Sequence, residues 1–124
     1  MRSNLGNAAF EGEFDKLQEL LTGKTSTEEL DTALHLAIEN ENHTCVVALV
    51  EKGASINSLV GGWKALDHAV DISIDGTIQT GGKPGDEPIE TITYLLERGA
   101  DKRSALNLAK KYENEKIVQI LENR

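Results

Sequence analysis

The acidic stretch that begins at Asp71 is the part of this sequence whose residue types and spacing come closest to a chemical site. Its letters, Asp-x-Ser-x-Asp-Gly, resemble the opening of a calcium-binding loop. Such a loop needs a bidentate acidic residue at its twelfth position, where this sequence has Gly82. The competing interpretation is a short β-hairpin, because Asp-Gly between alternating flanks favours a tight turn. We therefore predict no metal site, and keep a small ligand- or calcium-responsive domain that uses the loop from Asp71 to Asp86 as an alternative function.

The other chemistry-bearing residues form no recognisable catalytic group. His35, His43 and His68 do not have the spacing of metal ligands on one face. Cys45 has no nearby Lys or His that would lower its pKa, so we interpret it as a small core residue. The glycine-rich stretch at residues 81–85 lacks the P-loop pattern, and no serine lies in a G-x-S-x-G motif. The sequence therefore predicts no enzymatic activity and no cofactor.

Short apolar stripes at helical spacing make up the rest of the chain. Leu34, Ala37 and Ile38 form one face of a predicted helix, and after a polar break Val46 and Leu49 form a second. Each predicted helix is short and apolar on one side only. A single pair therefore cannot bury its own stripe and needs a neighbour of the same shape.

This helix pair recurs along the chain as Leu-x-x-Ala, a polar break, a second apolar stripe and a closing glycine. The Leu-x-x-Ala motifs lie at residues 5–8, 34–37, 66–69 and 106–109. The closing phrases EKGAS and ERGAD, at residues 51–55 and 97–101, are nearly identical. Repetition in phase at this period indicates a solenoid of stacked units.

The hexapeptide TALHLA at residues 32–37 and the phrase GASIN at residues 53–57 resemble the ankyrin repeat, whose pattern runs T-P-L-H-x-A, two helices, then G-A-D-x-N. The resemblance covers essentially the whole chain and implies an all-α fold. We expect a solenoid of about four helix-turn-helix units with finger loops and a short β-hairpin insertion in the third. The expected single domain is 1–124, with repeats at about 1–24, 25–57, 58–101 (insertion 72–86) and 102–124.

The composition limits the classes of partner. The chain has 124 residues and a formal net charge of −8, which argues against a nucleic-acid backbone or an anionic membrane as partner. The acidic excess suits a basic protein partner, although it is also an ordinary way to stay soluble. One cysteine, no apolar run of membrane-spanning length and no signal-peptide core favour a cytoplasmic protein, monomeric when free.

The resemblance also implies where a partner binds, because finger loops and first helices of ankyrin repeats line a concave groove. The positions before each helix break, together with Trp63 in the second finger and Asp75 in the insertion, are the expected contacts. Apolar groups on this surface are candidate anchors, and acidic groups are expected to meet basic ones. The predicted partner-binding residues are Phe10, Glu39, Asn40, Trp63, Asp71, Ile72, Asp75 and Tyr112.

We therefore predict a non-catalytic module that binds a protein partner through the concave groove and the insertion loop. A short, free-standing chain of this kind resembles the single-domain ankyrin proteins of bacteria, some of which are immunity proteins that neutralise a toxin. The negative charge would suit a basic, nucleic-acid-cleaving toxin. Besides the ligand-responsive domain, the remaining alternative is a scaffold or assembly subunit.

Overall fold

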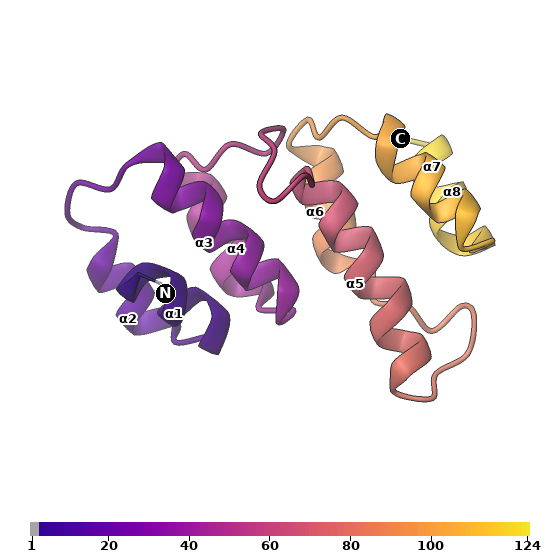
Figure 1. Ribbon diagram of the computed structural model, residues 1–124, viewed down its shortest axis with the longest axis horizontal. Coiled ribbons are helices and arrows are strands. Elements are labelled where there is room, and N and C mark those ends of the chain that lie inside the picture. The colour runs from indigo at the N-terminus through magenta and orange to yellow at the C-terminus, as the bar shows by residue number, and fades with distance from the viewer. Residues whose placement is uncertain (1–2) are drawn as a thin grey trace.

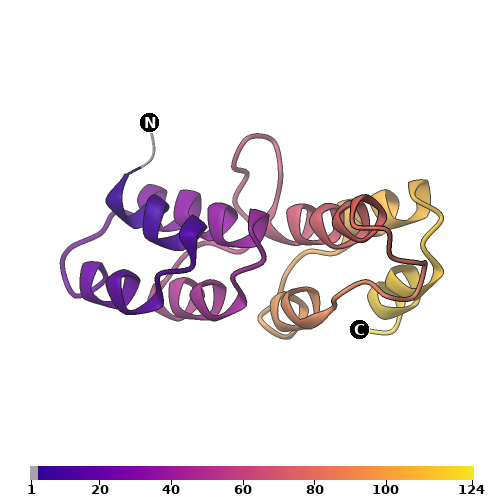
Figure 2. The ribbon, with the colours of Figure 1, turned by 90° about the horizontal axis from the view of Figure 1, so that it is seen from below.

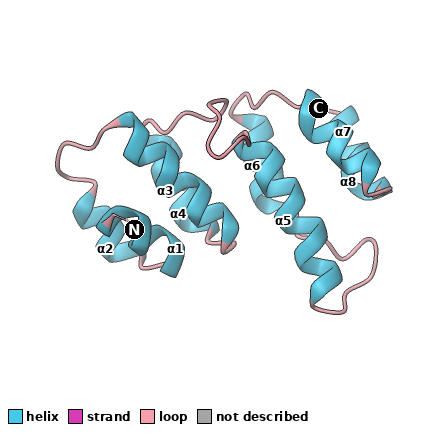
Figure 3. Cartoon of the chain, in the orientation of Figure 1, coloured by secondary structure: helices cyan, strands magenta, loops and turns pink. Residues whose placement is uncertain are grey.

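The computed structural model describes residues 3–124, which form eight α-helices and no β-strand over that range (Figures 1 and 3). The helices follow one another in four pairs. Their bounds are α1 Asn4–Glu11, α2 Phe14–Leu20, α3 Thr27–Glu39, α4 His43–Lys52, α5 Ala65–Gln79, α6 Glu90–Glu97, α7 Arg103–Lys111 and α8 Glu115–Glu122.

The helices are arranged in two layers, which Figure 2 shows as two rows. One row contains α1, α3, α5 and α7, and the other contains α2, α4, α6 and α8. Consecutive members of the first row contact each other, as do α2 with α4 and α4 with α6. The loop between α4 and α5 rises beyond the first row as a finger. None of the helices in residues 3–124 combines the length and the apolar character needed to cross a bilayer.

A continuous apolar core lies between the helices of the four pairs. Leu34, Leu49, Leu66 and Leu95 are fully buried, and the alanines of the Leu-x-x-Ala motifs let neighbouring helices approach closely. Cys45 is also buried, and burial raises the pKa of its thiol. The apolar stripes that the sequence placed on one side of each helix are therefore the surfaces on which the pairs stack.

Three of the four helix pairs are linked by the same tight turn, with one residue in the left-handed conformation. The backbone N–H that follows this residue donates to a carbonyl in the last turn of the first helix, which closes the helix end. The left-handed residues are Gly12, Glu41 and Glu113, with φ of 73°, 55° and 56°. The closing bonds are Glu13 N to Ala8 O, Asn42 N to Ala37 O and Asn114 N to Ala109 O, at 2.9, 2.9 and 3.1 Å.

The predicted β-hairpin at residues 72–78 is wrong, because α5 continues as a helix through this stretch to Gln79. Val70, Ile74 and Thr77 are buried and lie at helical spacing, so they extend the face that packs against the core. Ile72 and Ile74 also alternate with polar residues in the sequence, which is why the stretch resembled a strand. Burial of the helical face outweighs the turn preference of Asp75-Gly76 and the poor helix propensity of glycine.

Helix α5 ends in the same turn as the other first helices, but later in the chain. Gly82 N donates to Thr77 O at 2.8 Å, and Gly81 has a φ of 80°. Glu39, the last residue of α3, corresponds in the repeat pattern to Asp71. The α5 extension, residues 72–79, is therefore additional helix placed before an unchanged helix end.

The return segment, residues 80–89, is held against the neighbouring helices. Lys116 Nζ of α8 donates to Gly85 O at 2.8 Å and to Glu87 O at 2.7 Å. Ser73 Oγ of α5 donates to Pro88 O at 2.6 Å. The segment therefore links the third helix pair to the fourth.

The finger between α4 and α5 ends in a tight turn that resembles a β-hairpin turn. Val60 and Trp63 are bridged by two backbone hydrogen bonds of 2.8 and 3.1 Å. Gly61 and Gly62 between them have φ of 60° and 86°, values that favour glycine at both positions of a type I′ turn. No comparable finger precedes the second helix pair, because α3 begins at Thr27, where Ser26 Oγ accepts a hydrogen bond from Glu29 N at 3.1 Å.

Candidate functional site

Three of the expected partner-binding residues are carboxylates on α3 and α5, and we call the surface that carries them, Glu39, Asp71 and Asp75, the acidic face. Glu39 is exposed at the end of α3, and Asp71 is half-buried at the corresponding position of α5. Asp75 lies one turn further along the α5 extension and accepts a hydrogen bond from Gln79 Nε2 at 2.7 Å. The extension therefore lengthens the line of acidic side chains along this face.

Tyr112 joins this group from the fourth helix pair. Its hydroxyl donates a hydrogen bond of 2.6 Å to Asp71 Oδ1. That bond, with burial and the charges of Asp71 and Asp75, raises the pKa of Tyr112 to about 12. Tyr112 is therefore a neutral donor at any physiological pH, and it ties the end of α7 to the middle of α5.

Trp63 lies at the end of a row of three rings that crosses from the finger to α3. The Trp63 and His68 rings are 5.9 Å apart between centroids, and those of His68 and His35 are 5.3 Å apart. The Nδ1 atoms of the two histidines lie 3.2 Å apart, so one donates to the other. This row fixes the half-buried Trp63 next to the acidic face.

Burial keeps these two histidines neutral. It is the main cause that lowers the His35 pKa to about 4, and the neighbouring His68 lowers it further. Burial also lowers the pKa of His68, against the raising effects of Glu39 and Asp71. Glu39 and Asp71 are therefore close enough to affect the pKa of His68, and the Trp63 ring lies 5.9 Å from the His68 ring.

A shallow hollow of about 340 Å³ lies beside Trp63, between the finger and α7. Leu108 and Lys111 of α7 form one side, and Gly62 and Trp63 form the other. A side chain of a partner that enters this hollow would contact the indole and the inner face of α7. Trp63 and the hollow beside it could therefore both contact the same side chain of a partner.

Phe10 and Asn40 lie together, at the joint between α1 and α3. Asn40 Nδ2 donates to Phe10 O at 2.7 Å, and Asn42 Nδ2 donates to the same carbonyl at 2.7 Å. These bonds satisfy a carbonyl at the end of α1 that the helix itself leaves free. The amide of Asn40 therefore has a structural partner within the chain.

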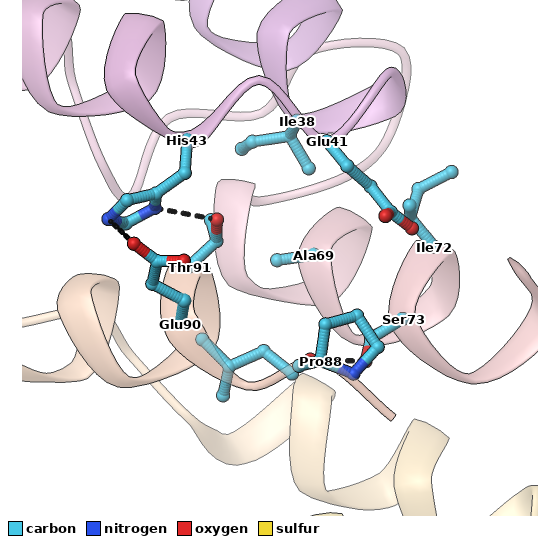
Figure 4. A pocket seen from close by; sticks show the side chains of 10 residues that line it. Ile38, Glu41, His43, Ala69, Ile72, Ser73, Pro88, Glu90 and Thr91 are labelled. Atoms are coloured by element: carbon cyan, nitrogen blue, oxygen red, sulfur yellow. Dashed lines mark hydrogen bonds and ion pairs between the residues drawn. The ribbon is translucent and has the colours of Figure 1, made fainter. Parts of the chain in front are cut away.

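Ile72 is separated from Trp63 and lines a different recess. It lies with Glu41 and Ala69 in a pocket between the α3–α4 turn, α5 and the start of α6 (Figure 4). Glu41 and His43 also line this pocket. Glu41 lies in the α3–α4 turn and His43 is the first residue of α4, and no local motif in the sequence marks either as a binding residue.

The calcium-loop interpretation of residues 71–76 is also wrong, because the stretch is helical and its polar side chains point to separate partners. Asp71 accepts from Tyr112, Ser73 donates to Pro88 O and Asp75 accepts from Gln79. A calcium loop needs these oxygens to converge on one point. Within residues 3–124 no group of three or more His, Cys, Asp or Glu is arranged to hold a metal ion.

The family model for ankyrin repeats, in three copies, matches residues 5–75. The match covers more than half of the chain, so the protein belongs to the ankyrin repeat family. Ankyrin repeats are in general protein–protein interaction modules and typically have no catalytic role. No curated protein matches the chain.

Proposed function

We propose that this protein binds a basic segment of a partner protein on the face formed by the finger, α3, α5 and α7. Trp63 is the apolar anchor, and Glu39, Asp71 and Asp75 meet the partner's lysine or arginine side chains. The observation that carries the proposal is that Trp63 packs on His68, which lies about one helical turn before Asp71 on α5. An aromatic group beside carboxylates provides both contact area and charge complementarity for a basic peptide.

The distribution of charge along the chain supports this choice of partner. The negative charge lies before residue 91: residues 1–90 carry 16 acidic and 6 basic side chains, a net −10, whereas residues 91–124 carry five acidic and seven basic, a net +2. The acidic excess therefore lies on the first three helix pairs, which include the helices that carry Glu39, Asp71 and Asp75. A basic partner would be attracted to this part of the solenoid, and the attraction would weaken with salt.

The fixed positions of these side chains support binding without a large loss of entropy. Tyr112 holds Asp71, Gln79 holds Asp75, and His68 packs on Trp63. Side chains that are ordered before binding lose less conformational freedom when the partner arrives.

The test begins with affinity purification of the protein from its source cells and identification of bound proteins by mass spectrometry. Calorimetry with the purified partner then compares Trp63→Ala, Glu39→Gln and the control Glu19→Gln, which alters an exposed acid of α2 in the other layer. We expect Trp63→Ala to weaken binding at least about tenfold and Glu39→Gln about 2- to 5-fold. Unchanged affinity in both, with helical content intact, would exclude this face.

A finer proposal concerns the identity of the partner. A basic, nucleic-acid-cleaving toxin is a partner class that the acidic face favours, which would make the protein a bacterial-type immunity protein. An adjacent open reading frame that encodes such a toxin, and growth rescue on co-expression, would support it. A partner without toxicity that assembles at fixed stoichiometry would favour a scaffold subunit instead. The cytoplasmic location and the monomeric free state stay predictions, and gel filtration tests the second.

A further inference from the structure

A pocket of about 200 Å³ lies on the turn side of the solenoid, between the second and third helix pairs (Figure 4). Its walls come from the α3–α4 turn, from α5 and from the residues at and just before the start of α6. The apolar part of the lining is Ile38, Ala69, Ile72, Pro88 and Ile92. The polar part is Glu41, His43, Ser73, Glu90 and Thr91.

The α5 extension and the return segment create two walls of this pocket. Ile72 and Ser73 are the first residues of the extension, and Pro88 lies on the return segment, held by the Ser73 hydroxyl. A helix pair with the short turn of α3–α4 would have none of these groups at this place. The pocket therefore depends on the feature that distinguishes the third pair from the other three.

Most of the polar groups at the mouth already have partners within the chain. Ser73 Oγ donates to Pro88 O, and His43 Nδ1 lies 2.9 Å from Thr91 Oγ1. The Glu90 carboxylate lies 3.3 Å from His43 Nε2 with 75% of its side chain exposed. Two carboxylates therefore remain open to a ligand: Glu41 on one side, and on the other Glu90, which contacts His43 but is largely exposed.

Glu41 is directed over α5 rather than away from the protein. A Cβ at Gly76 would lie 3.3 Å from Glu41 Oε1, so this carboxylate reaches across to the extension helix. Figure 4 shows Glu41 and Ile72 next to each other, with Glu90 and His43 on the other side of the recess. Within residues 3–124 no basic side chain forms an ion pair with Glu41.

The size and lining of the pocket define the kind of ligand. Small-molecule sites in proteins measure roughly 300–1,000 Å³, so this pocket suits a single side chain. Its apolar floor matches the methylene stem of a long side chain, and its carboxylate rim matches a cationic head. Lysine and arginine combine these two parts.

We propose that this pocket receives a lysine or arginine side chain of the protein partner, as a second anchor point on the turn side of the solenoid. The proposal rests on the proposed function, since it names a further contact for the same basic partner. The aliphatic stem lies on Ile38, Ala69 and Ile92, and the charged head lies between Glu41 and Glu90.

The test uses the whole protein and two small probes, the N-acetyl methylamides of lysine and arginine. The neutral analogue of norleucine, which has a similar stem and no charge, is the matched control. Amide chemical shifts of the isotopically labelled protein are followed by NMR during titration. We expect saturable shifts at Glu41, Ile72 and Ile92 with a cationic probe and none with the neutral one.

Two variants test whether the Glu41 carboxylate binds the cationic head of the probe. Glu41→Gln should weaken binding of the cationic probe about 2- to 5-fold. The control is Glu113→Gln, since Glu113 occupies the same left-handed turn position in the fourth pair, with φ of 56° against 55°, and lies outside the pocket. It should leave the affinity unchanged.

The outcomes are distinct from those of the proposed function, because the probes require no identified partner. Equal binding of the neutral probe, shifts confined to Glu39, Asp71 and Asp75, or no effect of Glu41→Gln would each overturn this proposal. The last two leave the acidic face intact as a binding surface. Once a partner is identified, an effect of Trp63→Ala without an effect of Glu41→Gln would support the face and exclude the pocket.

Discussion

The second and third helix pairs use the same helix ending to make two different connections. In the second pair, Asn42 N donates to Ala37 O, and three residues link α3 to α4. In the third pair, Gly82 N donates to Thr77 O, and ten residues link α5 to α6. The added chain in the third pair comprises two turns of helix and a return segment. Helices α3 and α5 therefore end in the same type of turn, and the turn comes later in α5 because its buried face is longer.

The comparison also explains why the two links differ in what they expose. The short link presents the polar residues Asn40 and Glu41, and Asn40 donates to a carbonyl at the end of α1 in the neighbouring pair. The long link builds one side of a pocket and reaches the fourth pair through Lys116. Both parts of the added chain are held in place: the α5 extension by burial of Ile74, and the return segment by its hydrogen bonds with Lys116.

The largest expected effect tests whether the α5 extension is part of the core. Ile74 is 2% exposed, so Ile74→Ala should lower the free energy of unfolding by about 2–5 kcal/mol. Ile78→Ala, at a side chain 60% exposed on the same extension, should change it by less than about 0.5 kcal/mol. Urea unfolding measures both, and a small effect at Ile74 would mean that the extension is frayed.

A second effect tests the joint between the two pairs, where His35 meets His68. The folded pKa of His35 is about 4 against 6.5 unfolded, so the unfolded chain binds the proton more readily between those values. The contribution to stability is fully present above about pH 6.5 and is lost as the pH falls toward 4. We expect urea unfolding to show a loss of about 2 kcal/mol between about pH 7 and pH 4.5.

His35→Gln is the matched variant for that measurement. It removes one titrating ring from the joint and should reduce the slope of the pH profile over this range, leaving the part that comes from His68, whose pKa burial also lowers. Asp101, whose pKa is lowered by bonds from Arg103 and Lys64, titrates at lower pH and does not account for the slope. An unchanged profile in His35→Gln would assign the effect to other groups.

A third effect separates the two links. Lys116→Met removes both bonds from α8 to the return segment and should lower stability by about 1 kcal/mol. Amide hydrogen exchange should accelerate at residues 83–89 and stay unchanged at residues 40–42. Lys52→Met, at an exposed lysine of α4, is the control. Equal acceleration in both links would show that Lys116 does not hold the return segment specifically.

The repeat pattern made much of this fold predictable, whereas the conformation of the insertion in the third pair was predicted wrongly. In-phase Leu-x-x-Ala motifs and second stripes predicted an all-helical ankyrin solenoid. Asp75-Gly76 carried a real turn preference, but burial of Ile74 and Thr77 decided the structure, and burial depends on neighbours that local sequence does not specify.

The candidate binding residues were also predictable only in part. The sequence selected Trp63, Asp71 and Tyr112 individually, and the structure adds that the last two share a hydrogen bond. The pocket could not be foreseen, because Glu41 and Pro88 come from different helix pairs. The link from Lys116 to the return segment joins residues about thirty positions apart, and no local pattern indicates such a contact.

The smallest effect compares two glycines in stretches that both carry a hairpin signal. Gly76→Ala should stabilise the protein by about 0.5–1 kcal/mol, because Gly76 is helical and alanine favours helix. Gly61→Ala should destabilise it by about 1 kcal/mol, because Gly61 has a φ of 60°. Thermal or urea unfolding gives both signs. An added Cβ at Gly76 would lie 3.3 Å from Glu41 Oε1, so the measurement is repeated with Glu41→Ala; destabilisation by Gly76→Ala in that background would contradict the helical assignment.

The length of the α5 extension has a directional consequence. Eight residues at 3.6 per turn rotate the chain by about 800°, which is about 80° more than two full turns. The polypeptide therefore leaves α5 aimed well to one side of the heading it takes on leaving α3, and about 12 Å further out. A turn of the α3–α4 kind would not return the chain to the start of α6, and residues 83–89 make that connection instead. A helix one residue shorter would let the chain leave α5 in a direction closer to the one in which it leaves α3.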